Sequence, residues 1–252
     1  MTLRADLNGT RALITGASSK GLGAHFACTL AQAGAEVVVA ARRMPQLEAL
    51  VARIAATGGS ARAVAMDVAD SDSIAAGLDI AGPIDILVNN AGVERSGAVL
   101  ALAEDDYDHV LDINLKGVWL VATETARRMK AAQSGGSIIN IASITGHRGM
   151  DGIAPYNISK AGVLQLTRQL AWSLARYGIR VNSISPGFFE TDINREFLAS
   201  SHGEAMRKRV AMRRFGSFGD LDGALLLLAS SASAFMTGSD LVVDGGHLLT
   251  PL

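Results

Sequence analysis

The sequence contains a single cysteine, Cys28, among its 252 residues, and aromatic side chains make up only 5% of the chain. One cysteine excludes an intramolecular disulfide and leaves no cysteine cluster that could hold a metal. The five histidines show no metal-ligand spacing either, so we expect no metal site. Cys28 lies between Phe26 and Leu30 in an alanine-rich stretch, where a small buried hydrophobic residue is the simplest interpretation.

An excess of charge of one sign and long hydrophobic runs are also missing. The formal net charge is −1 at pH 7, so no basic surface is available to attract nucleic acid. The short cluster at 207–209 (Arg-Lys-Arg) is more simply interpreted as a solvated helix face. No apolar run approaches membrane-spanning length, and residues 1–9 contain no signal-peptide core. These absences predict a cytoplasmic protein with no nucleic-acid and no membrane partner.

The sequence is rich in short β-branched runs that alternate with longer helical segments of alanine and leucine. Hydrophobic residues make up 49% of the chain and charged residues 19%, which allows a large buried core. Predicted strands cover 11–15, 36–41, 61–67, 84–89, 137–142, 179–185 and 240–243. Predicted helices cover 21–33, 45–57, 71–78, 104–131, 155–177, 190–210 and 220–230.

This alternation indicates an α/β fold. Continuous apolar strands such as Val37-Val38-Val39 are typical of a parallel sheet that is covered on both faces. Strand–helix alternation predicts right-handed βαβ units and a Rossmann-like, doubly wound parallel sheet of about seven strands, with helices on both faces. No linker or internal repeat divides the chain, so we expect a single domain over residues 1–252. Ligands of such sheets bind beyond the carboxyl ends of the strands.

A glycine-rich turn joins the first predicted strand to the first predicted helix. Glycines in such a turn let backbone N–H groups approach a diphosphate, and the amino end of the helix adds partial positive charge. The turn alone could be purely structural, but its position in a βαβ unit favours dinucleotide binding. The residues expected at this site are Gly16, Ser18, Ser19, Lys20, Gly21, Leu22 and Gly23.

The end of the second predicted strand indicates which dinucleotide is bound. Folds that prefer NAD place an acid there for the ribose 2′-hydroxyl, whereas this chain continues with Arg42 and Arg43. Together with Lys20, these arginines suit a 2′-phosphate, which a guanidinium can bind bidentately. We therefore predict a preference for NADP(H) over NAD(H). The alternative is that Arg42 and Arg43 are ordinary solvated residues at a helix start.

Short polar residues follow the third and fourth predicted strands at the same sheet edge. Asp67 ends the third strand, and the run 89–92 (Asn-Asn-Ala-Gly) follows the fourth. Such side chains can hold an adenine edge and pin a tight turn against a cofactor. Each could equally form an Asx turn of purely structural value.

Tyr156 and Lys160 lie four residues apart at the start of a predicted helix, so both side chains emerge on one face. A free phenol has a pKa of about 10, and a nearby ammonium can lower that pKa by roughly 1–3. The phenol would then approach the range useful for proton transfer to a carbonyl oxygen. Ser143 follows the fifth strand, where its hydroxyl can hold the same oxygen. A bare Tyr-x-x-x-Lys pair can also be an ordinary surface helix, but its combination with Ser143 and the glycine turn favours catalysis.

Together these motifs resemble the short-chain dehydrogenase/reductase family over nearly the whole chain. The resemblance implies that Tyr156 is the general acid/base, Lys160 its partner and Ser143 the hydroxyl that orients the oxygen. It also implies that Asn114 kinks the long helix and supports a proton-relay water, and that Lys160 reaches the nicotinamide ribose. The remaining cofactor contacts that it implies are Asp67, Val68, Asn90, Ala91, Gly92, Tyr156, Lys160, Pro186, Gly187, Phe189 and Thr191.

Two features depart from the family pattern. Four residues separate Gly16 from Gly21 where the family usually has three, which changes the N–H groups that can meet the diphosphate. The segment between Asp67 and Asn89 is shorter than usual, so we expect an abbreviated helix there.

The substrate stays open at this level. The motifs predict an oxidoreductase, a carbonyl reductase or alcohol dehydrogenase, that moves a hydride between the nicotinamide and a ketone or secondary alcohol. A 3-oxoacyl thioester reductase is an alternative, and a non-catalytic NADP-binding sensor is another. Residues 93–95, 147–150 and 188–214 are expected to line the substrate pocket, the last as a lid. The family resemblance also implies a homo-oligomer, a tetramer or dimer.

Overall fold

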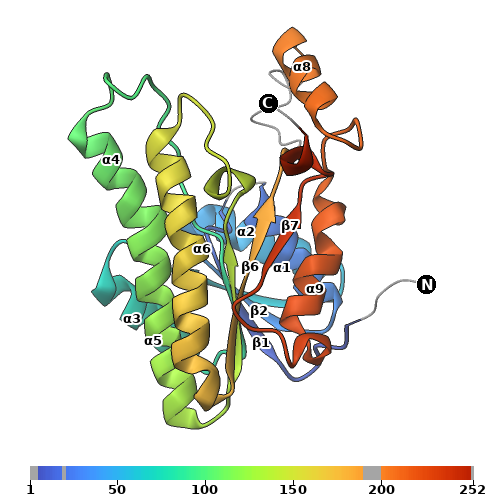
Figure 1. The fold of residues 1–252 in the computed structure, drawn as a ribbon. Helices are drawn as coiled ribbons and strands as arrows, with labels where there is room; N and C mark the ends of the chain where they lie inside the picture. The colour runs from blue at the N-terminus through green and yellow to red at the C-terminus, as the bar shows by residue number, and fades with distance from the viewer. Residues whose placement is uncertain (1–4, 19–20, 190–199, 251–252) are drawn as a thin grey trace.

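Seven strands form one sheet in the order β3-β2-β1-β4-β5-β6-β7 (Figure 1). We describe this architecture from a computed structural model, in which residues 5–18, 21–189 and 200–250 are described. Every pair of neighbouring strands is parallel. The strands are β1 (Arg11–Thr15), β2 (Glu36–Ala41), β3 (Ser60–Ala65), β4 (Ile86–Asn89), β5 (Gly136–Ile141), β6 (Ile179–Pro186) and β7 (Asp240–Val243). The predicted doubly wound parallel sheet is therefore confirmed.

Helices cover both faces of the sheet (Figure 1). One face carries α1 (Leu22–Gln32), α2 (Met44–Ala56) and α9 (Asp222–Ala229). The other face carries α3 (Ser71–Ala81), α4 (Glu104–Leu111), α5 (Gly117–Ala132) and α6 (Ala154–Leu174). A further helix, α8 (Ser201–Arg209), stands at the end of the molecule where β6 and β7 end.

The alternation of side chains along each strand divides the core into two layers. Val37 and Val39 pack in the cluster beneath α1, α2 and α9, whereas Val38 packs in the cluster beneath α3, α5 and α6. Successive side chains of a strand point to opposite faces, and all three valines are fully buried. Burial on both faces is the reason why the central strands are apolar at every position.

The predicted helix over 104–131 is divided in the structure. A π-helical turn, Asp112–Lys116, separates α4 from α5 and contains the fully buried Asn114. Single π turns inside α-helices are frequent at functional sites. The turn thus lies where the family resemblance places an interruption of the long helix.

Other boundaries also differ from the prediction. α3 continues to Ala81, three residues beyond the predicted end, and Asp70 caps it by accepting hydrogen bonds from the N–H groups of Asp72 and Ser73. A 3-10 turn, Phe218–Leu221, precedes α9 where one helix was predicted over 220–230. Of the predicted helix over 190–210, residues 190–199 lie outside the described part of the chain. No helix among the described residues is long and apolar enough to cross a membrane.

A chain of buried side-chain amides links the sheet to α6. Asn89 Nδ2 donates to Asn140 Oδ1 at 3.0 Å, and Asn140 Nδ2 donates to Thr167 Oγ1 at 2.9 Å. All three side chains are almost fully buried, so their polar atoms need partners inside the protein. These bonds hold α6 against β4 and β5 and so fix the helix that carries Tyr156 and Lys160.

Candidate active site

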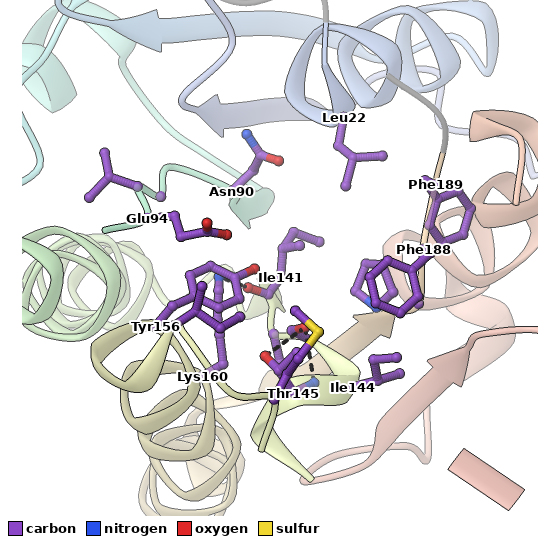
Figure 2. Close-up of a pocket in the computed structure, with 18 residues that line it drawn as sticks. Leu22, Asn90, Glu94, Ile141, Ile144, Thr145, Tyr156, Lys160, Phe188 and Phe189 are labelled. Atoms are coloured by element: carbon purple, nitrogen blue, oxygen red, sulfur yellow. Dashed lines mark hydrogen bonds between the residues drawn. The ribbon is translucent and has the colours of Figure 1, made fainter. Parts of the chain in front are cut away.

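Two adjoining cavities lie at the carboxyl edge of the sheet. The first, the glycine-turn cavity, has a volume of about 490 Å³ and extends from the glycine turn to the ends of β2 and β3. The second, the tyrosine cavity, has a volume of about 420 Å³ and contains Ser143, Tyr156 and Lys160 (Figure 2). The two cavities share four wall residues, Leu22, Asn90, Gly92 and Val93, so they form one continuous cleft.

The glycine turn is packed directly against the turn that follows β4. A Cβ atom on Gly16, whose φ is +69°, would lie 2.6 Å from the Ala91 Cα. Thr15 Oγ1 accepts from the N–H groups of Asn90 and Ala91, both at 3.1 Å. Asn90 Nδ2 donates in return to the carbonyl oxygens of Thr15 and Gly16. Only glycine tolerates this backbone conformation and approach, so the predicted role of Asn90 in pinning a tight turn matches the contacts.

The two arginines after β2 lie at the outer wall of the glycine-turn cavity. Arg43 Nη2 donates to Ser18 Oγ at 3.1 Å, which places its guanidinium beside the glycine turn. Arg42 faces Asp67, with 3.8 Å between Arg42 Nη1 and Asp67 Oδ2. Both arginine side chains are exposed, so both can meet a ligand from solvent. Ser19 and Lys20, predicted at this site, lie outside the described residues.

Asp67 and Val68 line the same cavity beyond the end of β3. Asp67 Oδ1 accepts from the Ala69 N–H at 3.0 Å, which is an Asx turn. The structural alternative for this residue is therefore present, while its second carboxylate oxygen faces Arg42.

Ser143 is held by Thr145 at the end of β5. Its Oγ accepts from the Thr145 N–H at 3.1 Å and from Thr145 Oγ1 at 3.0 Å (Figure 2). A serine hydroxyl has two acceptor positions and one proton to donate. Both acceptor positions of Ser143 Oγ are used, so its proton is left to form a hydrogen bond with another oxygen in the tyrosine cavity. The Tyr156 hydroxyl is such an oxygen.

Tyr156 and Lys160 lie on the same side of α6, as predicted. The Lys160 amine lies 5.5 Å from the centre of the Tyr156 ring. Its Nζ donates to the Ile141 carbonyl oxygen at 2.7 Å, and the side chain is 4% exposed. The lysine is therefore a buried amine anchored on the end of β5, directly beside the phenol.

The expected lowering of the phenol pKa is wrong in sign for this structure. Burial raises the pKa of Tyr156 to about 12, and the negative charge of Glu94 raises it further, although a hydrogen bond with Ser143 lowers it. Burial also lowers the pKa of Lys160 to about 8. Desolvation disfavours the charged form of each group and outweighs their proximity. At neutral pH the phenol therefore keeps its proton.

Asn114 uses its side chain to hold the segment after β4. Its Oδ1 accepts from the Val93 N–H and its Nδ2 donates to the Val93 carbonyl, both at 2.8 Å. Nδ2 also lies 3.2 Å from Ser159 Oγ. The side-chain amide thus fixes the wall of the tyrosine cavity.

The end of β6 forms the wall opposite Tyr156 (Figure 2). The Gly187 N–H donates to the Val243 carbonyl at 2.9 Å, and a Cβ on Gly187 would lie 2.7 Å from Asp244 Cβ. Pro186, Gly187 and Phe189, which the family resemblance implies as cofactor contacts, line the cavity. Thr191 and a large part of the expected lid over 188–214 lie outside the described residues.

Comparisons with known proteins show to which family the chain belongs. The family model described as Enoyl-(Acyl carrier protein) reductase matches residues 16–247. The gluconate 5-dehydrogenase of Gluconobacter oxydans is 36% identical over 96% of this chain and 95% of its own length. The chain belongs to the short-chain dehydrogenase/reductase family. Its members are oxidoreductases that act on alcohol and ketone groups.

The chain is also similar to other short-chain dehydrogenase/reductases. A 3-oxoacyl-[acyl-carrier-protein] reductase of Synechocystis is 38% identical over 94% of this chain and 96% of its own length. The crystal structure of a gluconate 5-dehydrogenase from Burkholderia cenocepacia, in complex with NADP and tartrate, has a TM-score of 0.93 and 39% identity. That comparison covers 98% of each chain.

Several groups at the site of this short-chain dehydrogenase/reductase were not predicted from the sequence. Thr145 holds Ser143, the Ile141 carbonyl holds Lys160, and Asn140 belongs to the buried amide chain. Thr145 was open to detection, since a hydroxyl two residues after Ser143 is well placed for a local hydrogen bond. The described residues contain no group of three or more His, Cys, Asp or Glu side chains arranged to hold a metal ion.

Proposed function

We propose that the protein is an NADP(H)-dependent oxidoreductase that moves a hydride between the nicotinamide and a ketone or secondary alcohol. The observation that carries this proposal is the arrangement of Ser143, Tyr156 and Lys160 in one cavity that opens into the glycine-turn cavity. A phenol, an orienting hydroxyl and a buried amine are of little use to a cofactor-binding sensor, which needs no acid.

The residues of the glycine-turn cavity fit a nicotinamide dinucleotide. Gly16 and Gly23 keep the turn tight, and α1 begins there with no acidic side chain in its first turn. Anionic groups bind at such helix ends. Arg43 beside Ser18, with Arg42 behind it, would hold a 2′-phosphate. The NADP held by the Burkholderia relative supports the same preference.

In the proposed reaction, a bound cofactor would supply or take up the hydride at the carbonyl carbon. Tyr156 donates its proton to the carbonyl oxygen during reduction and takes it back during oxidation. Its raised pKa keeps the phenol protonated at neutral pH, which suits the reductive direction. Ser143 donates a hydrogen bond to the same oxygen, and Lys160 places positive charge beside the phenolate that forms.

The test is to substitute Tyr156→Phe and assay a panel of ketones with NADPH and NADH, including a 3-oxoacyl thioester. General acid–base catalysis contributes about 10²–10⁴-fold, so we expect kcat to fall by that factor while the affinity for NADPH is retained. Tyr107→Phe is the control. The Tyr107 side chain is exposed on α4, so this variant should keep full activity. Equal turnover by Tyr156→Phe and wild type would contradict the proposal and favour the sensor.

We also propose that the protein is a homo-oligomer. α5 exposes Trp119, and α6 exposes Ile158 and Trp172, whose side chain is 83% exposed. Exposed tryptophans on neighbouring helices are typical of protein interfaces. Light scattering by the purified protein measures its mass in solution directly.

A further inference from the structure

The tyrosine cavity contains one acidic side chain, Glu94, among its described wall residues. Figure 2 shows Glu94 and Tyr156 on the same side of the cavity, with Phe188 and Phe189 on the opposite side. The charge of Glu94 acts on the phenol, since it is one of the causes that raise the pKa of Tyr156. Glu94 therefore lies close enough to influence a molecule that is bound at the reacting oxygen.

The backbone on which Glu94 stands is held firmly. Both hydrogen-bonding groups of the preceding residue, Val93, are bound by the Asn114 side chain at 2.8 Å. The Asn114 side chain is itself fully buried in the π-helical turn. The carboxylate is steadied by Ser96, whose Oγ donates to Glu94 Oε1 at 2.8 Å. The position of the acid is thus set by the fold rather than by a mobile loop tip.

The charge of Glu94 is not neutralised by its neighbours. The guanidinium of the next residue, Arg95, pairs with Asp106 on α4, with 3.4 Å between Arg95 Nε and Asp106 Oδ1. Its Nη1 donates to the backbone carbonyl of Glu94 at 3.3 Å and not to the carboxylate. Lys160, the only cationic residue among the described wall residues, is anchored on the Ile141 carbonyl. Within the described part of the chain, no Lys, Arg or His makes an ion pair with Glu94. The carboxylate therefore presents a net negative charge to the cavity.

The remaining described wall of the cavity is mainly apolar. Its hydrophobic residues are Leu22, Val93, Ile141, Ile144, Met150, Ile153, Phe188 and Phe189. Apolar walls of this kind hold a ligand by shape, and a few polar groups then fix its orientation. In this cavity Glu94 is the charged group available to do so beyond the catalytic residues.

We propose that Glu94 is a specificity-determining residue that selects substrates with a hydroxyl or ammonium group beside the carbonyl and rejects substrates with a carboxylate there. The inference rests on the proposed function and names its substrate class. A carboxylate accepts hydrogen bonds from such donors and repels a second anion.

Four small ketones of similar shape test the proposal with NADPH: hydroxyacetone, aminoacetone, 2-butanone and pyruvate. The first three differ only in the group on the carbon beside the carbonyl, which is a hydroxyl, an ammonium or a methyl, and pyruvate carries a carboxylate directly on the carbonyl carbon. In Glu94→Gln we expect kcat/KM to fall about tenfold for aminoacetone and to rise about tenfold for pyruvate, because a charge–charge interaction is removed. The value for 2-butanone should stay the same, and the value for hydroxyacetone should change little because glutamine still accepts a hydrogen bond.

Glu104→Gln is the matched control. It makes the same change at an exposed position in the first turn of α4, outside the cavity, and should leave all four kcat/KM values unchanged. Equal changes in Glu94→Gln and Glu104→Gln, or a Glu94→Gln variant that treats the four ketones as wild type does, would overturn the inference. Glu94 is exposed, so its substitution does not threaten folding.

A binding measurement separates the failure of this inference from the failure of the proposed function. Calorimetry of tartrate, a small dicarboxylate, with the NADP-loaded protein should give about tenfold higher affinity in Glu94→Gln than in wild type. Equal affinities, or no binding by either, would overturn the inference even if ketones are reduced. A protein that reduces no ketone but shows the tartrate difference would instead remove the proposed function and keep the role of Glu94.

Discussion

The glycine-turn cavity and the tyrosine cavity share four wall residues but hold their charged groups in different ways. In the glycine-turn cavity, Arg42 and Arg43 are exposed and lie on an edge open to solvent. In the tyrosine cavity, Lys160 is 4% exposed and has a fixed hydrogen bond to the Ile141 carbonyl. Burial disfavours the charged form of an amine, so Lys160 gives up its proton more easily than a free lysine does. One cavity is therefore suited to binding a charged ligand and the other to moving a proton.

If this contrast is correct, removal of the buried amine should have the largest effect. Lys160→Ala takes away the positive charge beside Tyr156 and leaves the Ile141 carbonyl without its partner. We expect kcat to fall by about 10² or more. The free energy of unfolding should fall by about 1–3 kcal/mol because the carbonyl is left unpaired. Steady-state kinetics and chemical denaturation measure the two effects separately.

The control is Lys130→Ala, because Lys130 is an exposed lysine near the end of α5, remote from both cavities. Its kcat should equal that of wild type. A Lys160→Ala variant that retained wild-type kcat would show that burial of the amine has no catalytic purpose.

Loss of an exposed arginine should have a smaller and more selective effect. Arg43→Ala removes the guanidinium that lies on Ser18, so we expect the affinity for NADPH to fall by about 10–100-fold. NADH, which lacks the 2′-phosphate, should bind as before. Fluorescence titration with each cofactor measures both constants, and Arg42→Ala should show the smaller loss because Arg42 faces Asp67.

Arg53→Ala, on the exposed surface of α2, removes the same charge away from the cleft and should change neither constant. Parallel losses of NADPH and NADH affinity in Arg43→Ala would mean that this arginine contributes general charge and does not recognise the 2′-phosphate.

The smallest expected effect is a difference between the pKa values of two tyrosines, which spectroscopy can measure. Burial raises the pKa of Tyr156 to about 12, whereas hydrogen bonds from Arg176 and Lys130 lower the pKa of the partly buried Tyr177. In an alkaline titration of phenolate absorbance, Tyr177→Phe should remove the first ionisation and Tyr156→Phe the last. Because the folded state holds the Tyr156 proton more tightly than the unfolded chain does, this group contributes stability that is lost between about pH 10 and pH 12. A Tyr156→Phe variant that removed the first step would contradict the burial argument.

Much of the fold could be predicted from the sequence because its determinants are local. The valines of β2 indicate a strand buried on both faces, and the glycine turn marks the start of α1. The pair Tyr156 and Lys160 could be placed together because helical geometry alone brings residues four apart to one face. The interruption near Asn114 came from family resemblance, since nothing in the helical pattern of 104–131 predicts a π turn there.

Properties of the site that depend on distant contacts could not be predicted. Arg42 and Arg43 were equivalent in the sequence, and the structure distinguishes them because Arg43 lies beside Ser18 and Arg42 faces Asp67. The sign of the Tyr156 pKa shift was wrong because the sequence shows the nearby lysine but not the burial that outweighs it.

The amino-acid sequence by itself determined the order of the strands and helices, the glycine turn and the spacing of the phenol and amine on one helix. Each of these depends on backbone geometry over a few neighbouring residues. The tertiary structure decided that Lys160 is anchored on Ile141, that Asn114 holds Val93, and that the charge of Glu94 acts on Tyr156. Lys160 and Ile141 are 19 positions apart in the sequence, and Asn114 and Val93 are 21 positions apart. Only packing of the strands and helices around the cleft brings them into contact and sets their desolvation.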